Sequence, residues 1–171
     1  MVATTERVTS LRPTLVLVGT AAALYVTDQI TKAIVVANLG VGEYVSLLGD
    51  LVRIWHVQNN GAAFSLFQGA IWLFLPVTVV ALAMVAWFHR SLRDRTIWIQ
   101  VILGMILAGT LGNLTDRVRL GYVVDFVSVG FGDVRFPTFN VADASLVVGI
   151  ILLVIYLTFV ESAGTSSEPG P

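Results

Sequence analysis

Two aspartates could carry chemistry, because each interrupts sequence that is otherwise apolar. Asp125 lies within Tyr122–Val127 (YVVDFV), where an unpaired buried carboxylate would be unfavourable. Asp143 stands at the start of the last apolar stretch, three residues after Asn140. Two carboxyl groups that share a site do not easily ionise together, so one keeps a proton while the other acts as a base. Such a pair can activate water and protonate a peptide carbonyl without a metal or a nucleophilic side chain.

Asn140 and Asp143 also fit a purely structural role. Asn140 suits the N-cap of a helix, which places Asp143 at the third helical position. There a carboxylate meets free backbone N–H groups and the positive end of the helix dipole. Capping alone would account for both residues, so the spacing leaves the structural and the catalytic interpretation open.

A charged pair lies inside the first apolar stretch. Lys32 follows Asp28 by one helical turn and therefore shares its face. Ionisable groups within a membrane are costly and usually face a protein interior or a water-filled cavity. The two residues either neutralise one another so that the helix can insert, or line a polar site.

The third apolar stretch ends in a polar cluster. Asn113, Asp116 and Arg117 are spaced i, i+3 and i+4, so they share one helix face. Asp116 and Arg117 fit an interfacial ion pair that fixes the following loop, and they fit contact with a substrate equally well. Upstream, small residues recur every four positions, as close packing of membrane helices requires: Gly104, Ala108 and Gly112.

Several other chemistries are excluded or poorly supported. The chain has no cysteine, which excludes disulfides, thiolate nucleophiles and cysteine-based zinc sites. It has two histidines, His56 and His89, too few for a histidine-based metal cluster. The sequence motifs of serine hydrolases, zinc proteases and P-loop NTPases are absent. A net charge of −1 gives no basic surplus for binding nucleic acid. We therefore expect no metal and no cofactor.

The composition is that of a membrane protein. The 171 residues are 56% hydrophobic and 12% charged, and the mean hydropathy is +0.85. Soluble domains carry about 25% charged residues, so a water-facing surface could not be covered. We expect one membrane-embedded domain over residues 1–171. Four stretches approach the ~20 residues that a spanning helix needs: Leu15–Val36, Ile71–Phe88, Ile97–Leu114 and Val141–Val160.

The first stretch resembles a secretory signal peptide in part, because Arg7 and Arg12 precede it and Ala21 and Ala23 form an A-x-A pattern. Apolar sequence resumes after these alanines and continues to Val36, which favours a retained anchor. The C-terminal tail, Ser162–Pro171, is rich in Ser, Gly and Pro, and its composition predicts disorder.

Arginines in short loops predict the orientation. Arg90, Arg93 and Arg95 crowd the connection between the second and third stretches, which places it, and both termini, in the cytoplasm. Arginines also occur on the opposite side, so the density of charge, more than its count, favours this orientation. Two longer loops, residues 37–70 and 115–139, then face outward. They contain three predicted strands, the last two forming a hairpin around residues 130–132: Leu51–Gln58, Tyr122–Val129 and Val134–Phe139.

Taken together, the polar segments resemble lipoprotein signal peptidase (signal peptidase II), a family of bacterial membrane enzymes with four transmembrane helices. The matching segments occur in the family's order, from the first apolar stretch to the fourth. They are residues 28–32 (DQITK), 59–65 (NNGAAFS), 112–117 (GNLTDR), 123–126 (VVDF) and 139–143 (FNVAD).

The resemblance implies an aspartyl endopeptidase with Asp125 and Asp143 as its catalytic pair. It implies a fold of four helices with a small extracytoplasmic β-structure, in the bacterial cell membrane, and no obligate protein partner. The family's substrates are prolipoproteins, which it cleaves just before a diacylglyceryl-modified cysteine. The residues expected to line the site or hold the substrate are Asp28, Asn59, Gly61, Asn113, Arg117 and Asn140.

Two alternatives remain open at this point. A small four-helix transporter or assembly subunit would also carry polar residues within its spans, but it would need them through the full membrane depth, whereas here they gather toward one face. A metal-dependent membrane hydrolase would use aspartates as ligands, and it predicts loss of activity with a chelator.

Overall fold

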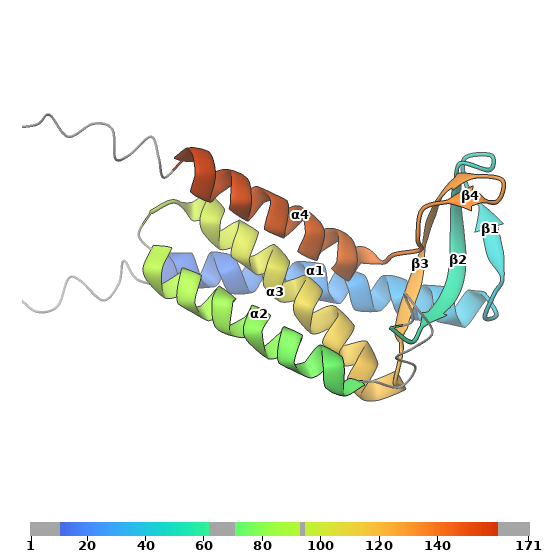
Figure 1. Ribbon diagram of the computed structural model, residues 1–171, viewed down its shortest axis with the longest axis horizontal. Coiled ribbons are helices and arrows are strands. Elements are labelled where there is room, and N and C mark those ends of the chain that lie inside the picture. Colours follow the sequence, from blue (N-terminus) through green and yellow to red (C-terminus); the bar gives the residue numbers. More distant parts are fainter. Residues whose placement is uncertain (1–10, 62–70, 93–94, 161–171) are drawn as a thin grey trace, which may run out of the picture.

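The computed structural model describes residues 11–61, 71–92 and 95–160, so the predicted disordered tail lies outside the described residues. Four helices lie side by side, and a small sheet covers one end of the bundle (Figure 1). In chain order the elements are α1 (Leu11–Asn38), β1 (Tyr44–Ser46), β2 (Val52–Asn59), α2 (Ile71–Leu92), α3 (Ile97–Leu120), β3 (Val123–Phe131), β4 (Val134–Arg135) and α4 (Val141–Ile155), which continues as a π-helical turn (Tyr156–Val160).

All four helices are long and apolar enough to cross a membrane. α3 extends six residues beyond the predicted stretch Ile97–Leu114. The helix continues to Leu120, and Gly121 caps its C-terminus. Gly121 adopts φ +83°, a left-handed conformation that favours glycine at a helix C-terminus. The extension keeps Asp116 and Arg117 helical, so they project from a rigid element.

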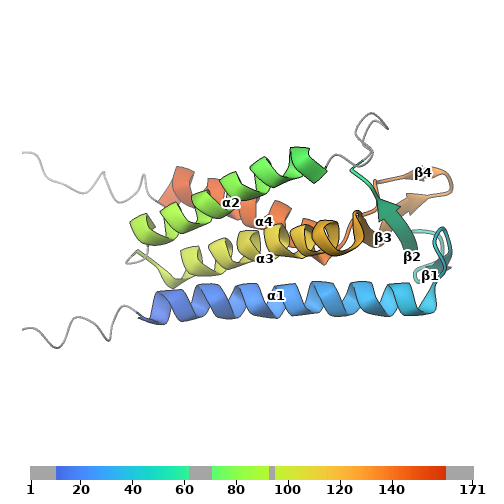
Figure 2. The ribbon, with the colours of Figure 1, turned by 90° about the horizontal axis from the view of Figure 1, so that it is seen from below.

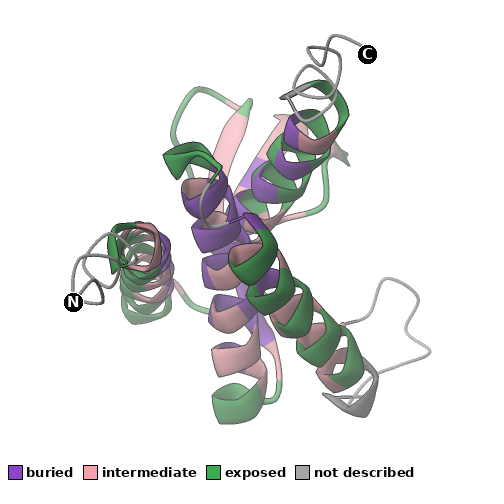
Figure 3. Cartoon of the chain, turned by 90° about the vertical axis from the view of Figure 1, so that its left-hand side faces the viewer, coloured by how far each residue is buried: buried purple, intermediate pink, exposed green. Residues whose placement is uncertain are grey.

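α3 is the centre of the bundle. In its apolar span 61% of the residues are buried, against 17%, 17% and 22% in the other three helices. Figure 2 shows α3 lying between α1 and α2, and α4 also packs against it. Viewed along the bundle, buried residues gather in the middle and exposed ones on the outward faces (Figure 3). The outer faces of α1, α2 and α4 are therefore available to lipid.

Glycines let the neighbouring helices approach α3 closely. A Cβ added at Gly104 would lie 2.8 Å from the carbonyl oxygen of Leu17 in α1. One added at Gly109 would lie 2.4 Å from the carbonyl oxygen of Ala142 in α4. Gly112 is enclosed from both sides, by α1 and by α4. This is the close packing that the spacing of small residues predicts.

The sheet is antiparallel, with strand order β1-β2-β3-β4. β2 and β3 match the predicted strands to within two residues at each end, whereas β1, only three residues long, was not predicted. The predicted strand Val134–Phe139 was too long: β4 is only Val134–Arg135. Pro137 has no backbone N–H to continue the pairing.

The chain nevertheless returns to β3 just before α4 begins. The backbone N–H of Phe139 donates to the carbonyl of Val127 at 3.0 Å. The carbonyl of Phe139 accepts from the N–H groups of Phe126 and Val127, at 3.1 and 2.7 Å. Asn140, the next residue, is thereby held against the strand that carries Asp125.

The sheet is attached to the end of the bundle. The Nδ1–H of the buried His56 in β2 donates to the carbonyl of Leu39, just beyond α1, at 2.8 Å. Asp50, in the β1–β2 turn, accepts the backbone N–H of Gly132 at 2.6 Å and pairs with Arg53 and Arg135. The Gly132 hydrogen bond and these arginines lower the pKa of Asp50. The two hairpin turns are thereby joined.

The close packing of α3 can be tested with a matched pair of glycines. Gly109→Ala should lower the free energy of unfolding by ~1–3 kcal/mol, because the new methyl group would overlap the α4 backbone. Gly19→Ala, on the exposed face of α1 with no atom within 4 Å of its Cβ, should be neutral or stabilising by up to ~1 kcal/mol. Thermal unfolding in detergent micelles measures both, and equal melting temperatures would contradict the packing described.

Candidate active site

The two predicted catalytic aspartates are bound to the same residue. Asp125 lies in the middle of β3 and Asp143 in the first turn of α4. The side-chain Nδ2 of Asn140 donates to Asp125 Oδ1 at 2.8 Å, and the backbone N–H of Asn140 donates to Asp143 Oδ2 at 3.1 Å. One residue therefore sets the separation between the two carboxyl groups.

Asn140 and Asp143 also form the capping box that their spacing predicts. Asn140 Oδ1 accepts the backbone N–H of Asp143 at 2.8 Å, and Asp143 Oδ2 accepts that of Asn140. The cap occupies only one oxygen of Asp143 and leaves the Nδ2 of Asn140 free to bind Asp125. The structural and the catalytic interpretations of this motif are therefore compatible.

Each of the four carboxylate oxygens accepts one hydrogen bond from an asparagine. In addition to the two bonds from Asn140, Asn59 Nδ2 donates to Asp125 Oδ2 at 2.8 Å, and Asn113 Nδ2 donates to Asp143 Oδ1 at 2.7 Å. A carboxylate oxygen has two lone pairs, so every oxygen keeps capacity for a proton or a water molecule.

The amide orientations are determined by what the amide oxygens accept. Asn59 Oδ1 accepts the backbone N–H of Gly61 at 2.9 Å. Asn113 Oδ1 accepts from Lys32 Nζ at 3.3 Å and from Asn140 Nδ2 at 3.1 Å. Because each of these oxygens faces a donor, the NH₂ groups must face the carboxylates.

A buried ion cluster lies beneath the aspartate pair. Lys32 Nζ is 2.8 Å from Asp28 Oδ2 and 2.9 Å from Asp116 Oδ2, and all three side chains are at most 5% exposed. The predicted pairing within α1 is confirmed. The interpretation of Asp116 and Arg117 as an ion pair is wrong, because consecutive helical residues point in different directions and Asp116 faces α1. With its third bond to Asn113, the ammonium group uses all three of its donors.

The cluster also holds the backbone beside each aspartate of the pair. Asp28 Oδ1 accepts the N–H of Ala142 at 2.8 Å, and Asp116 Oδ2 accepts the N–H of Val124 at 3.1 Å. Ala142 and Val124 are the residues directly before the two aspartates. The cluster around Lys32 thus connects α1 and α3 to both segments that carry the pair.

Arg117 lies at the outer end of a cavity beside the pair. Its guanidinium carbon is 4.2 Å from the centre of the Phe74 ring, and its Nη1 donates weakly to the carbonyl of Asn113 at 3.4 Å. The cavity, of about 210 Å³, lies between α2, α3 and α4. Its lining residues are Phe74, Val77, Thr78, Ala81, Gly109, Thr110, Asn113, Arg117, Asp143 and Leu146.

Gly61 holds the end of β2 close to this cavity. It adopts φ +81°, in the left-handed region that favours glycine, and a Cβ there would lie 2.6 Å from Phe74 Cε2. The hydrogen bond that its N–H donates to Asn59 also fixes the amide that binds Asp125. Residues 62–65 of the predicted loop segment lie outside the described part of the chain.

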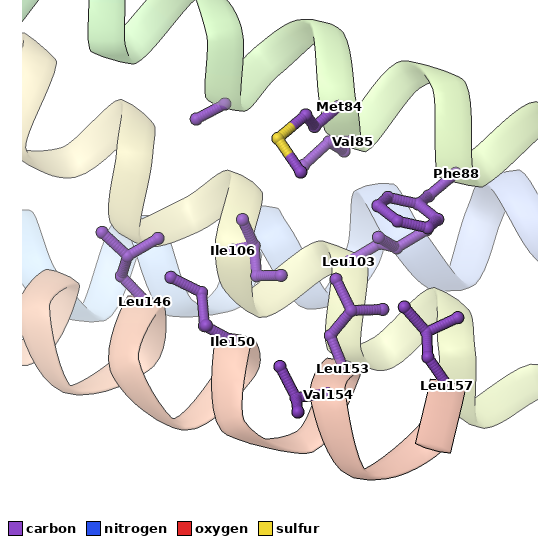
Figure 4. Close-up of a pocket in the computed structure, with 11 residues that line it drawn as sticks. Met84, Val85, Phe88, Leu103, Ile106, Leu146, Ile150, Leu153, Val154 and Leu157 are labelled. Atoms are coloured by element: carbon purple, nitrogen blue, oxygen red, sulfur yellow. The ribbon is translucent and has the colours of Figure 1, made fainter. Parts of the chain in front are cut away.

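A second, apolar cavity continues the first. It has a volume of about 300 Å³ and lies further from the sheet between the same three helices (Figure 4). Ala81 and Leu146 line both cavities, so a polar chamber beside Asp143 leads into an apolar groove. The groove is lined by Ala81, Met84, Val85, Phe88, Leu103, Ile106, Leu146, Ile150, Leu153, Val154 and Leu157.

Burial gives Asp125 an unusual affinity for protons. The side chain lies outside the spanning helices but is almost fully enclosed, and this burial raises its pKa to about 6. The charge of Asp143 raises the pKa further, whereas the hydrogen bonds from Asn59 and Asn140 and the charge of Lys32 oppose the rise. Asp125 can therefore exchange a proton close to neutral pH.

The structure brings together most of the residues that the sequence analysis singled out. Asn59, Asn113 and Asn140 bind the two aspartates, and Arg117 and Gly61 lie beside the cavity. Asp28 is 1% exposed, and its carboxylate is directed at the start of α4. The contact of Lys32 with Asn113 and the cavity positions of Phe74 and Thr78 were not predicted. Only Thr78 gave a signal, as a polar residue in an apolar helix.

Comparisons with known proteins agree on one family. A family model described as "Signal peptidase (SPase) II" matches residues 20–159. A lipoprotein signal peptidase of Enterococcus faecalis is 39% identical over 143 residues, 84% of this chain and 88% of that protein. One of Dehalococcoides mccartyi is 49% identical over 147 residues, 82% of this chain and 88% of that protein.

Two solved structures, both titled as bacterial membrane enzymes, share the fold. One has a TM-score of 0.75 and 31% sequence identity, and covers 91% of this chain and 93% of its own. The other has a TM-score of 0.74 and 33% identity, and covers 84% of this chain and 92% of its own.

The hydrogen bond from Asn59 should set the pH at which Asp125 titrates. In the unmodified protein Asp125 should titrate near pH 6. The donated N–H stabilises the ionised carboxylate, so Asn59→Ala should move the titration to higher pH. Isotope-edited infrared spectroscopy of the carboxyl stretch measures it, with Asp125→Asn used to assign the band. Asn38→Ala, which removes an exposed amide at the end of α1, should leave the titration unchanged. A shift to lower pH would contradict the assignment.

Proposed function

The chain belongs to the signal peptidase II family, and we propose that its peptidase activity is carried by Asp125 and Asp143. The chain is accordingly a membrane hydrolase of the aspartic type, in a family whose members remove signal peptides from prolipoproteins. The observation that carries the residue assignment is the bridge through Asn140, which binds one oxygen of each carboxyl group. This bridge supports the proposal that both acids would act on one water molecule.

The pair would act as general base and general acid. The raised pKa of Asp125 favours the shared proton on this residue, so that Asp143 would act as the base. Asp143 would take a proton from water as the water oxygen attacks the peptide carbonyl carbon, while Asp125 would give its proton to the carbonyl oxygen. As the tetrahedral intermediate collapses, Asp125 would take a proton from one of its two hydroxyl groups, the C–N bond would break, and the proton held by Asp143 would pass to the leaving amine, which returns the pair to its starting state.

The two cavities would hold different parts of the substrate. A peptide beside Asp143 would occupy the polar chamber, and the acyl chains of a diacylglyceryl-modified cysteine would extend into the apolar groove (Figure 4). Because the groove is formed between helices, a lipid-anchored precursor can enter it laterally while its acyl chains stay in apolar surroundings. Such a site would select lipidated precursors cut next to the modified cysteine.

The other site residues would orient the pair or contact the substrate. Asn59, Asn113 and Asn140 would fix the carboxyl groups, and Arg117 would donate to carbonyl oxygens of the peptide. Asp28 would act indirectly, by holding the first turn of α4. Gly61 would let the end of β2 approach the substrate closely.

We further propose that the pair faces the extracytoplasmic side of a bacterial cell membrane. α1 begins and α4 ends at the end of the bundle opposite the sheet (Figure 1). That end has Arg90 in the last turn of α2 and Arg95 in the connection to α3, as the positive-inside rule requires of the cytoplasmic side. Trp87 and Trp98 are exposed near the same connection, where tryptophans anchor helices at the membrane interface. The whole chain would form one peptidase domain, without an obligate protein partner.

A transporter is less well supported. Polar residues do occur at the end of the bundle opposite the sheet, where His89 is hydrogen-bonded to Thr14 and to Gln100. Between Gln100 and Thr110, however, the central helix α3 carries nine apolar residues or glycines in succession. A polar path along the axis of the bundle is therefore interrupted on the helix that every other helix contacts.

Substitution of either aspartate tests the assignment of the pair. Asp125→Asn and Asp143→Asn should each reduce cleavage of a diacylglyceryl-modified precursor peptide by more than ~10³-fold, because each removes one half of the acid–base pair. Mass spectrometry of the products and the melting temperature of each variant complete the measurement.

Wild-type-like turnover by either variant, with its fold intact, would remove that residue from the pair. A chelator serves as the second arm of the experiment. Cleavage by the unmodified protein should be unaffected by it, since a water activated by two carboxyl groups requires no ion. Loss of activity with the chelator would favour the metal-dependent alternative.

The proposed course of the acyl chains can be tested at the junction of the two cavities. Ala81→Phe should fill the junction and lower kcat/KM for the lipidated peptide by about tenfold or more, because the acyl chains would lose their pocket. Ala83→Phe, two residues away on the exposed face of α2, is the matched control and should have little effect. Equal kinetics of the two variants would show that the chains lie elsewhere.

A further inference from the structure

One polar side chain in α2 has no structural explanation. Between Ile71 and Phe88 every residue except Thr78 is apolar. Thr78 is half-buried, and it lines the polar chamber instead of facing lipid. A hydroxyl group in apolar surroundings is unfavourable unless it is hydrogen-bonded, so its place in this helix calls for a partner.

Other threonines of the bundle satisfy their hydroxyl groups within the helix. Thr27, Thr31, Thr110 and Thr115 each donate to the carbonyl four residues earlier, at 2.7–2.9 Å. The hydroxyl of Thr78 makes no hydrogen bond to any described residue of the chain. Its donor and acceptor capacity is therefore available to a molecule in the chamber.

Thr78 stands between the aspartate pair and the apolar groove. α2 runs away from the sheet, so Phe74 lies one turn closer to the sheet than Thr78, and Ala81 lies about one turn deeper. On the opposite wall of the chamber, Asn113 and Asp143 mark the end near the aspartate pair. Ala81, which lines both cavities, marks the end where the groove begins. A molecule that reaches from the pair to the groove along the α2 side of the chamber therefore passes Thr78.

Resting on the proposed function, we propose that Thr78 donates a hydrogen bond to an ester carbonyl of the substrate's diacylglyceryl group. In such a substrate the modified cysteine lies next to the cleaved bond, and its thioether leads to glycerol, then to two esters, then to the acyl chains. The esters are the only acceptors on the lipid between these two ends. Thr78 is thus a specificity-determining residue that distinguishes acyl esters from ethers.

The test uses two enzymes and two substrates. The substrates are a peptide with a diacylglyceryl cysteine and the same peptide with ether-linked alkyl chains, which lack the carbonyl oxygens. Thr78→Val keeps the shape of the side chain and removes the hydroxyl. On the ester peptide it should raise KM by about twofold to tenfold, the equivalent of one neutral hydrogen bond, with kcat unchanged. On the ether peptide the variant and the unmodified enzyme should have the same KM.

Two further variants complete the experiment. Thr78→Ser keeps the hydroxyl and should retain the KM of the unmodified enzyme for the ester peptide. Thr27→Val, the same change on the exposed face of α1, should alter neither substrate's kinetics. An equal effect of Thr78→Val on both peptides, or no effect on either, would overturn the inference while the proposed function stands. Failure of the unmodified enzyme to cleave the ester peptide would overturn both.

Discussion

Two carboxyl groups can stay close together in a buried site only if donors hold their oxygens in place. Here the donors are asparagines, which add no charge and so leave the pair free to exchange a proton. An amide can bind a carboxylate only through its nitrogen, and each amide oxygen is occupied by another donor. Each hydrogen bond around Asp125 and Asp143 therefore depends on the others, and the packing of the bundle brings the three asparagines together.

The bundle meets this requirement through its central helix. Glycines on α3 allow the backbones of α1 and α4 to pack directly against this helix. Because α1 and α4 are then close to each other, Asp28 on α1 reaches the N–H of Ala142 on α4. A buried lysine then balances two carboxylates that would otherwise be unpaired in apolar surroundings. Without the small residues of α3, neither the ion cluster nor the start of α4 could be where it is.

The sequence allows the helices and the polar residues Asp28, Asn113, Asp125 and Asp143 to be singled out, because each of these residues interrupts or ends an apolar stretch. The roles of the aspartate pair and the place of Asn59 beside it were expected from the resemblance to the family. The sequence predicts β4 poorly, since the pairing that ends at Arg135 depends on Pro137 and on a single return contact at Phe139. It could not give the partner of Asp116. Spacing places Asp116 beside Arg117, but the direction in which each side chain points depends on where α1 and α2 pack. The cavities likewise form where α2, α3 and α4 pack together, so their position cannot be predicted from a local sequence pattern.

The site is assembled from segments spread along the described chain: Lys32 comes from α1, Asn59 from β2, Asn113 from α3, and the pair itself is divided between β3 and the first turn of α4. Phe139 joins these last two segments directly. During synthesis, therefore, a chain that has inserted three helices carries only one of the two acids and lacks the residue that bridges them. On the proposed assignment of Asp125 and Asp143, proteolytic activity would arise only when the fourth helix enters the membrane, so that incompletely inserted chains would present no active peptidase to the proteins around them.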